Sequence, residues 1–365
     1  MRLRPILVLL VLVFLASTAF AQTPPYNRTI IVPATGNATA DGAALLAAVT
    51  GITPTPSSAN RWLIKLEPGI YDMGKAQLVM QDYVDIEGSG TLETEIRSNI
   101  PFTGSLLFGV VDASARAELR ELTVSCISNA ENDACQGISI LDANPNLTDL
   151  RIFIQGSGAG SHWGIRTFNS VPKLDRVDVR VTPAASANSY GIVYGGASGM
   201  NITRSKILAR NGSLDNLGIL FREDPVWSVI RDTTVQGTGG NRAVGVMFFP
   251  GDHTQVFSFD NVHVQGNGGN TSIGIAEDGS FGSPNIFYRQ GRIYGEDFGV
   301  NQLNAKIQLV NSEARGEVSV QANIVRIGSS WLDGGTGSGT VVGLSSKICA
   351  NVWDKAFTAY TSTCP

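Results

Sequence analysis

A glycine followed by isoleucine or valine returns at nearly constant intervals along the middle of the chain, within stretches where apolar and polar residues alternate. A constant period in the twenties to forties is typical of a solenoid, in which each repeat buries its apolar face against the next. The pattern therefore predicts one solenoid domain with coils of about 27 residues. The pairs, 25 to 29 residues apart, are Gly109-Val110, Gly137-Ile138, Gly164-Ile165, Gly191-Ile192, Gly218-Ile219, Gly245-Val246, Gly274-Ile275 and Gly299-Val300.

The apolar residues within each repeat have the period of two that is typical of β-strands. After Gly164, for example, Leu174, Val177, Val179 and Val181 are separated by polar residues. Clusters of Gly, Asn, Ser, Asp and Pro between these runs indicate turns. No repeat sustains the 3.6-residue stripe of a helix, which excludes ankyrin and tetratricopeptide arrays, and the leucine-rich-repeat pattern is absent. We therefore expect an all-β fold, a parallel β-helix with strands stacked about 4.8 Å apart.

The two ends of the chain differ from the repeats. Residues 1–21 resemble a secretory signal, with arginines at the start, an apolar run too short to span a bilayer, and a small-residue cleavage site. Residues 22–340 form the expected β-helix domain, and residues 341–365 its C-terminal cap. The run Asp41–Val49 is the best helix candidate, with Asp41 as its N-cap. Such a helix would cover the open edge of the first coil.

Charge and cysteine content limit the classes of partner and the compartment. The chain has 27 basic and 31 acidic residues, and loss of the two signal arginines leaves 25 basic residues and a net charge of −6. This acidity argues against nucleic acid as a partner. Four cysteines in a secreted chain suit two disulfides. Of the three possible pairings, proximity favours Cys126 with Cys135 and Cys349 with Cys364. We expect a protein secreted to the extracellular space or periplasm, with no membrane span after cleavage.

Two stretches near the start resemble a known superfamily. The segment Trp62–Tyr71 ends in Pro-Gly-Ile-Tyr, and Val84–Gly90 follows as a second coil. Both resemble the pectin-lyase-like right-handed β-helices, and more narrowly the pectinesterases and their secreted relatives, over roughly residues 29–335. The resemblance implies a right-handed parallel β-helix. It does not imply an activity, because this fold hosts lyases, hydrolases, esterases, adhesins and inert spacers.

Charged and aromatic residues recur at the same offset from the repeated glycine. Positions two and four after the glycine should face outward. Position four places Arg222, Phe249 and Asp278 on three neighbouring coils, and position two adds Arg166. An aromatic ring flanked by a cation and a carboxylate suits a sugar-acid site, whereas the alternative is an ordinary solvated strand face. The residue just before each glycine is expected to face inward as a core stack: Trp163, Tyr190, Leu217, Val244, Ile273 and Phe298.

The pectinesterase resemblance also implies catalytic residues. The segment Gly274–Asp278 resembles the family's GxQDT motif, and Asp297–Gly299 a shortened DFIFG motif, which implies Asp278 as the acid and Asp297 as the nucleophile or base. Three features depart from the family. Glu277 replaces the amide that should stabilise an oxyanion, and Ser329 stands where an arginine is expected. The repeat phase also separates the two aspartates by six residues along a strand, or roughly 20 Å.

Other enzyme motifs are missing from the sequence. Polygalacturonase signatures, Gly-x-Ser-x-Gly, His-Glu-x-x-His and the phosphate-binding loop do not occur. Asp252 with His253 on a glycine turn is the most reactive-looking pair, although such a pair is usually only a loop. We therefore predict neither a metal nor a cofactor.

Three hypotheses of function follow from these patterns. The first is a secreted, monomeric, non-catalytic scaffold that binds extracellular or cell-wall polysaccharide or serves in adhesion, with Arg166, Arg222, Phe249, Asp252 and Glu277 as ligand-binding residues. The second is a divergent pectinesterase using Asp278 and Asp297. The third is a structural module without a ligand.

Overall fold

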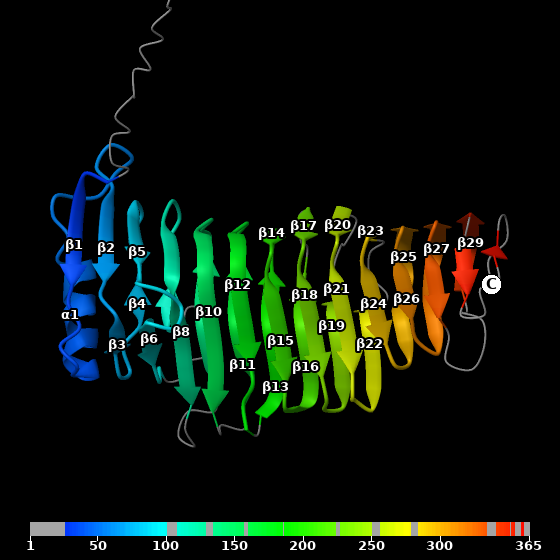
Figure 1. The fold of residues 1–365 in the computed structure, drawn as a ribbon, viewed down its shortest axis with the longest axis horizontal. Coiled ribbons are helices and arrows are strands. Elements are labelled where there is room, and N and C mark those ends of the chain that lie inside the picture. The colour runs from blue at the N-terminus through cyan, green and yellow to red at the C-terminus, as the bar shows by residue number, and fades with distance from the viewer. Residues whose placement is uncertain are drawn as a thin grey trace, which may run out of the picture.

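The computed structural model describes residues 26–100, 108–128, 134–156, 160–184, 186–223, 227–249, 256–278, 284–333, 341–350, 352–354 and 359–360. These residues form a stack of coils (Figure 1), in which every described strand except the last pairs in parallel with a strand of a neighbouring coil. The 31 strands form one hydrogen-bonded system because several strands bend from one side of the coil to the next. The pairings nevertheless divide into three sides, which we call sheets one, two and three.

Sheet one begins at the N-terminal end and contains β1 (Arg28–Val32), β2 (Trp62–Leu66), β5 (Val84–Glu87), the first halves of β8 (Glu118–Ser128), β10 (Asn146–Gly156) and β12 (Lys173–Val181), then β14 (Met200–Thr203), β17 (Ser228–Arg231), β20 (Val256–Asp260) and β23 (Asn285–Arg289). Sheet two contains β3 (Gly69–Asp72), β6 (Thr94–Ser98), the second halves of β8, β10 and β12, β15 (Lys206–Arg210), β18 (Thr234–Thr238), β21 (His263–Asn267), β24 (Arg292–Gly295), β26 (Glu313–Arg315), β28 (Trp331–Asp333) and β30 (Val352–Asp354). Sheet three contains β4 (Leu78–Val79), β7 (Val111–Asp112), β9 (Cys135–Leu141), β11 (His162–Phe168), β13 (Ser186–Gly195), β16 (Gly212–Phe221), β19 (Arg242–Phe248) and β22 (Thr271–Glu277). The last long strands run from sheet three into sheet one: β25 (Phe298–Val310), β27 (Val318–Gly328) and β29 (Val341–Ala350).

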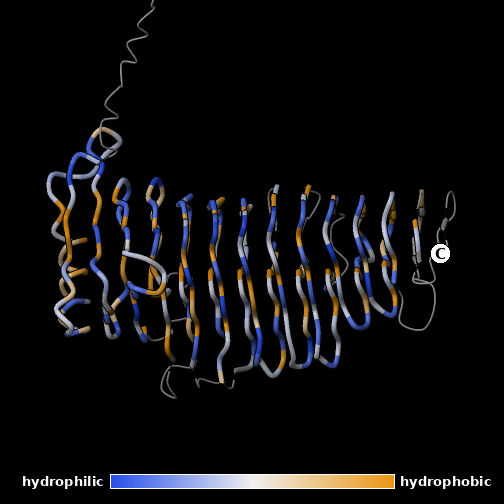
Figure 2. The backbone as a smooth tube through the Cα atoms, in the orientation of Figure 1, coloured by the Kyte–Doolittle hydropathy of each residue, from blue (hydrophilic) through white to orange (hydrophobic). Residues whose placement is uncertain are grey.

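The predicted parallel β-helix with coils of about 27 residues is confirmed. Apolar and polar residues alternate along the coils (Figure 2), and the apolar ones form a continuous buried core. Aromatic rings stack from coil to coil inside it, with centroids 5.5 Å apart for Tyr194 and Phe221 and 4.9 Å apart for Phe221 and Phe248. Removing one such ring, as in Phe221→Ala, typically costs about 3–5 kcal/mol of unfolding free energy.

The corner between sheets one and two depends on one residue per coil with positive φ. Asp149, Arg176 and Arg204 occupy this left-handed region in successive coils, with φ of 50°, 54° and 50°. The region is uncommon for residues other than glycine. Arg176 bridges two coils here, because its Nε lies 2.5 Å from Oδ1 of Asp149. This corner could not be predicted from the sequence, since Arg is not a typical residue for positive φ.

A helix covers the N-terminal end of the stack, as predicted. Helix α1 (Ala38–Thr50) packs against β1 and β3 (Figure 1). The prediction of Asp41 as the N-cap is wrong. Asn37 is the N-cap, and its side chain accepts a hydrogen bond from the Ala40 N–H. Asp41 lies inside the first turn, where its carboxylate accepts hydrogen bonds from the N–H and hydroxyl of Thr35, which lower the pKa of Asp41.

Of the two predicted disulfides, the structure describes one completely. Cys126 and Cys135 are bonded, with Cα atoms 6.0 Å apart, as predicted. Cys364, the expected partner of Cys349, lies outside the described residues, as does the predicted signal at 1–21. At the far end β30 pairs antiparallel with β31 (Ala359–Tyr360). In the described part of the chain no helix is long and apolar enough to cross a membrane.

Candidate functional site

The outer face of sheet three carries the predicted column of Arg222, Phe249 and Asp278. Their backbone N–H groups donate to the carbonyls of Tyr194, Phe221 and Phe248, at 2.7, 2.8 and 2.9 Å. Each residue is therefore hydrogen-bonded to the coil before it at the same register. The three residues follow one another on adjacent coils, as the glycine offset predicts.

Beneath this column lies a second apolar cluster, separate from the core of the solenoid. Its buried members come from β13, β16, β19 and β22, and four half-buried aromatic rings pack against it. The buried members are Val193, Leu217, Leu220, Val244, Met247, Ile273 and Ala276, and the rings are Trp163, Tyr190, Phe249 and Phe298. The cluster forms an apolar floor outside the coil.

The prediction that the residues before each glycine form a stack inside the coil is wrong in direction. Leu217, Val244 and Ile273 are buried, but all six residues belong to this second cluster and not to the core of the solenoid. The cause is the glycine itself, which faces inward together with the residue after it. A Cβ on Gly164 would lie 2.3 Å from Cγ1 of Val179, a core residue on the opposite wall. Because Gly164 and Ile165 both face inward, the alternation is interrupted, and Trp163 faces outward. Only glycine permits this close approach of the walls.

Two arginines on this floor, Arg166 and Arg222, form no ion pair with a described carboxylate, although the negative charge of Glu223 acts on Arg166. The Arg166 guanidinium lies over the Trp163 ring at 5.4 Å from its centroid, and that of Arg222 lies over Phe249 at 5.9 Å. Neither arginine forms an ion pair with any described carboxylate. Burial, followed by the positive charge of Arg222, lowers the pKa of Arg166. The pair is a partly desolvated cluster of like charge, which a bound anion would stabilise.

A third arginine, Arg242, is neutralised. Its Nε and Nη2 donate to the two oxygens of Asp215 at 2.8 and 2.9 Å, and its Nη1 donates to Oδ2 of Asp278 at 2.5 Å. Its guanidinium also lies 6.0 Å from the Phe249 centroid. Neither Asp215 nor Arg242 was among the predicted site residues. Both lie three residues before the repeated glycine, on adjacent coils. Opposite charges at the same offset in neighbouring repeats are therefore the sequence pattern that indicates this ion pair.

Tyr190 supplies a hydroxyl to this surface. Its ring stacks on Trp163 at a centroid distance of 6.2 Å and an interplanar angle of 22°. Burial, with a smaller contribution from the negative charge of Asp215, raises the pKa of Tyr190 to about 12. The phenol therefore keeps its proton at neutral pH and can donate a hydrogen bond.

Other predicted site residues lie apart from this column. Glu277 pairs in register with Phe248 of the coil before it, whose side chain faces the core. The Glu277 carboxylate accepts hydrogen bonds from the backbone and side-chain nitrogens of Asn304, both at 3.1 Å. Asp297 lies at the other end of β22, where its Oδ2 accepts from the Ser272 N–H at 2.7 Å. Because Ser272 and Asp278 are six residues apart, the two predicted catalytic aspartates are separated by roughly 20 Å along the strand.

The remaining expectations concern Asp252 and metal binding. Asp252 lies outside the described residues. Among the residues that the structure does describe, no group of three or more His, Cys, Asp or Glu side chains could hold a metal ion.

Comparison with known proteins gives neighbours in structure only. No protein-family model matches the chain, and no curated protein matches it in sequence. The mannuronan C-5 epimerase AlgE6 A-module of Azotobacter vinelandii is 13% identical, with a TM-score of 0.42 over 91% of this chain and 98% of that chain. The catalytic domain of a GH87 alpha-1,3-glucanase is 11% identical, with a TM-score of 0.42 over 88% of this chain and 64% of that one.

A pectin methylesterase, PemA from Erwinia chrysanthemi, is 11% identical, with a TM-score of 0.28 over 80% of this chain and 79% of that one. At these values the similarities carry no argument about activity or substrate. The strand pairings themselves show that this chain is a parallel β-helix protein.

Proposed function

We propose that this protein binds an acidic polysaccharide, without chemically changing it, along the outer face of sheet three. The observation that supports this most strongly is the pair Arg166 and Arg222, which form no ion pair with a described carboxylate and lie over aromatic rings. Two cations held together beside half-buried aromatic rings favour a ligand that combines negative charge with apolar surface.

A uronic acid polymer has this combination. The C–H face of a sugar ring is apolar and can lie on an aromatic ring such as Phe249 or Tyr190, while the carboxylate can bind a guanidinium through two parallel hydrogen bonds. Because neighbouring coils repeat about every 4.8 Å, successive sugars can meet equivalent positions along the stack. We therefore take polygalacturonate as the test ligand.

The geometry supports binding over catalysis. A pair of carboxyls that act on one sugar unit must lie on either side of it, within roughly 10 Å. Asp278 and Asp297 are separated by about twice that distance along β22. Asp278 also forms an ion pair with Arg242, and Asp297 accepts a hydrogen bond from the backbone N–H of Ser272. The second candidate function, a divergent pectinesterase, rests on the exposure of Asp278 alone, whose side chain is 47% accessible.

The signal-like residues 1–21, together with the Cys126–Cys135 disulfide, support secretion, because disulfides persist in oxidising compartments. We propose a secreted monomer in the extracellular space or periplasm.

The test uses the chain from Gln22 to Pro365 and measures binding and turnover on the same samples. Calorimetric titration with a partly methyl-esterified galacturonate hexamer is followed by assays of released methanol and of unsaturated uronates. We expect binding without either product, and a Phe249→Ala variant that binds at least about tenfold more weakly, a loss of roughly 1.4 kcal/mol. Trp227→Ala is the matched control, since Trp227 is an exposed aromatic residue directly before β17 of sheet one.

Two results would contradict the proposal. Absence of binding by the folded protein would favour a structural module. Methanol release that disappears in Asp278→Asn and in Asp297→Asn would instead establish the pectinesterase function.

A further inference from the structure

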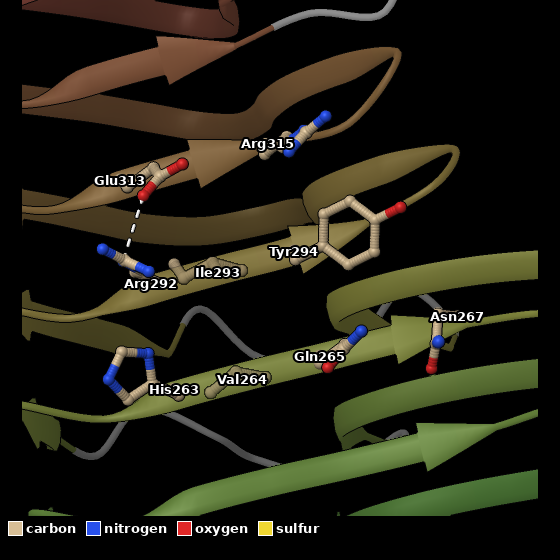
Figure 3. A pocket seen from close by; sticks show the side chains of 9 residues that line it. All are labelled: His263, Val264, Gln265, Asn267, Arg292, Ile293, Tyr294, Glu313 and Arg315. Atoms are coloured by element: carbon tan, nitrogen blue, oxygen red, sulfur yellow. Dashed lines mark ion pairs between the residues drawn. The ribbon is translucent and has the colours of Figure 1, made fainter.

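Two adjoining cavities lie on the outer face of sheet two, near the C-terminal end of the stack. Their volumes are about 480 and 530 Å³, within the range of small-molecule sites. Both are lined by His263, Arg292 and Glu313, whose side chains follow one another on β21, β24 and β26 (Figure 3). The two cavities therefore form one groove that runs across several coils.

The groove consists of two outward columns in strict register. The first column continues from Glu313 to Trp331 and Trp353 on the next two coils. The second contains Gln265 and Tyr294, with Arg315 on the following coil (Figure 3). Neighbouring members of a column are separated by about 4.8 Å, the spacing of paired strands.

The charged side chains in this groove are paired with one another. Arg292 Nε lies 3.2 Å from Oε2 of Glu313, and Arg315 Nε lies 3.3 Å from Oδ2 of Asp333. The Arg315 guanidinium also lies over the Tyr294 ring, 5.6 Å from its centroid. Each pair brings one positive and one negative charge together, so the charge of the pair favours neither an acidic nor a basic ligand. Neutral hydroxyls, in contrast, can accept hydrogen bonds from the guanidinium and donate them to the carboxylate while both ion pairs persist.

Aromatic rings complete the surface. Trp331 and Trp353 are direct neighbours on β28 and β30, and Trp353 is 37% exposed. Tyr294 is half-buried two coils earlier. The rings are embedded among polar side chains, so they do not form the contiguous apolar patch that marks a protein partner. Separate ring faces among hydroxyl-binding groups fit a chain of sugars better.

We infer that the groove of His263, Arg292, Tyr294, Glu313, Trp331 and Trp353 is a second glycan-binding surface, and that its ligand is a neutral polysaccharide. The sugar rings lie on Tyr294 and on the tryptophans, and their hydroxyls bind the paired charges between these rings. This surface is separate from the arginine face of sheet three and does not depend on the function proposed there.

The experiment is a titration of the Gln22–Pro365 chain with xylohexaose and cellohexaose as neutral probes and galacturonate hexamer as the acidic one. We expect at least one neutral hexamer to bind, and both Tyr294→Ala and Trp353→Ala to weaken that binding about tenfold or more while leaving galacturonate affinity unchanged. Trp227→Ala is the matched exposed aromatic control. Circular dichroism and thermal unfolding establish that each variant is folded.

Three outcomes would overturn the inference. The first is that neither neutral hexamer binds the folded protein. The second is that neutral binding is unaffected by Tyr294→Ala and Trp353→Ala and is lost in Arg222→Ala, which would place the sugar on sheet three. The third is that Trp353→Ala lowers the affinity for galacturonate. Galacturonate would then bind in the groove, and the groove would not be specific for neutral sugars. Failure of galacturonate binding alone would contradict only the function proposed for sheet three.

Discussion

Sheets two and three have the same parallel pairing and nearly the same period, yet their outer faces differ in how charge is distributed. On sheet three, Arg166 and Arg222 form no ion pair with a described carboxylate and lie beside half-buried aromatic rings. On sheet two, Arg292 and Arg315 are each paired with a carboxylate of the next coil. In a solenoid, the residue at one offset always neighbours the residue at the same offset one coil away. The order of charges along a column therefore decides whether a face carries free charge.

The largest effect should come from removing the free charge of sheet three. The double variant Arg166→Ala/Arg222→Ala should lower galacturonate affinity by about 100-fold or more, because each charge-assisted hydrogen bond contributes about 1.5–3 kcal/mol. Affinity for a neutral hexamer should stay within twofold. Calorimetric titration of both ligands measures this, and an equal loss for both would remove the distinction between the faces.

A smaller effect is expected from releasing charge of the opposite sign. Arg242→Gln leaves Asp215 and Asp278 without their shared cation, so two carboxylates oppose an acidic ligand. We expect galacturonate affinity to fall about tenfold. Because a lysine cannot donate two parallel hydrogen bonds to Asp215, Arg242→Lys should restore the affinity only partly. An unchanged affinity in Arg242→Gln would mean that this triad lies outside the ligand's path.

Salt should separate the two faces in the unmodified protein. Raising ionic strength from about 0.05 to about 0.5 M shortens the screening length from about 14 to about 4 Å. Galacturonate affinity should then decrease roughly fivefold, whereas neutral-hexamer affinity should change little. Parallel titrations at several salt concentrations test this, and equal slopes for the two ligands would contradict it.

Asp278→Asn should have a modest effect of opposite sign. Removing a carboxylate from the arginine face should strengthen galacturonate binding about twofold to threefold, since less than 1 kcal/mol of repulsion is expected at a half-exposed site. The same substitution would abolish methanol release if Asp278 were catalytic. A single preparation assayed for both properties distinguishes the two roles.

The buried His162 should make the stability of the fold depend on pH. His162 is fully buried at the start of β11, and burial lowers its pKa. The folded state therefore holds the neutral ring. The contribution of the neutral His162 ring to the free energy of unfolding should be fully present above the unfolded pKa of about 6.5. Below this pH the free energy of unfolding should decrease by up to about 1.4 kcal/mol per pH unit. Denaturant unfolding of the wild type and of His162→Gln between pH 7 and 5 measures this. An identical pH dependence in both proteins would contradict it.

The sequence predicted the period, the strands and the outward column because these follow from local alternation and a constant offset. It did not predict that Trp163 and Tyr190 face outward, because the glycine after each interrupts the alternation at a close contact between walls. Nor did it identify the ion pair of Asp215 with Arg242, which forms between residues 27 positions apart. Asp41 fitted the N-cap pattern, but Thr35 binds its carboxylate inside the first turn. The sequence pattern did not predict the groove of sheet two, because its aromatic residues lie in coils that depart from the 27-residue period.

The most direct test of binding by sheet three is a crystal structure of the Gln22–Pro365 chain with a partly methyl-esterified galacturonate hexamer. We expect carboxylates bound at Arg166 and Arg222, sugar rings on Phe249 and Tyr190, and an intact hexamer with its methyl esters in place. A hexamer found only on sheet two, or de-esterified beside Asp278, would contradict this expectation.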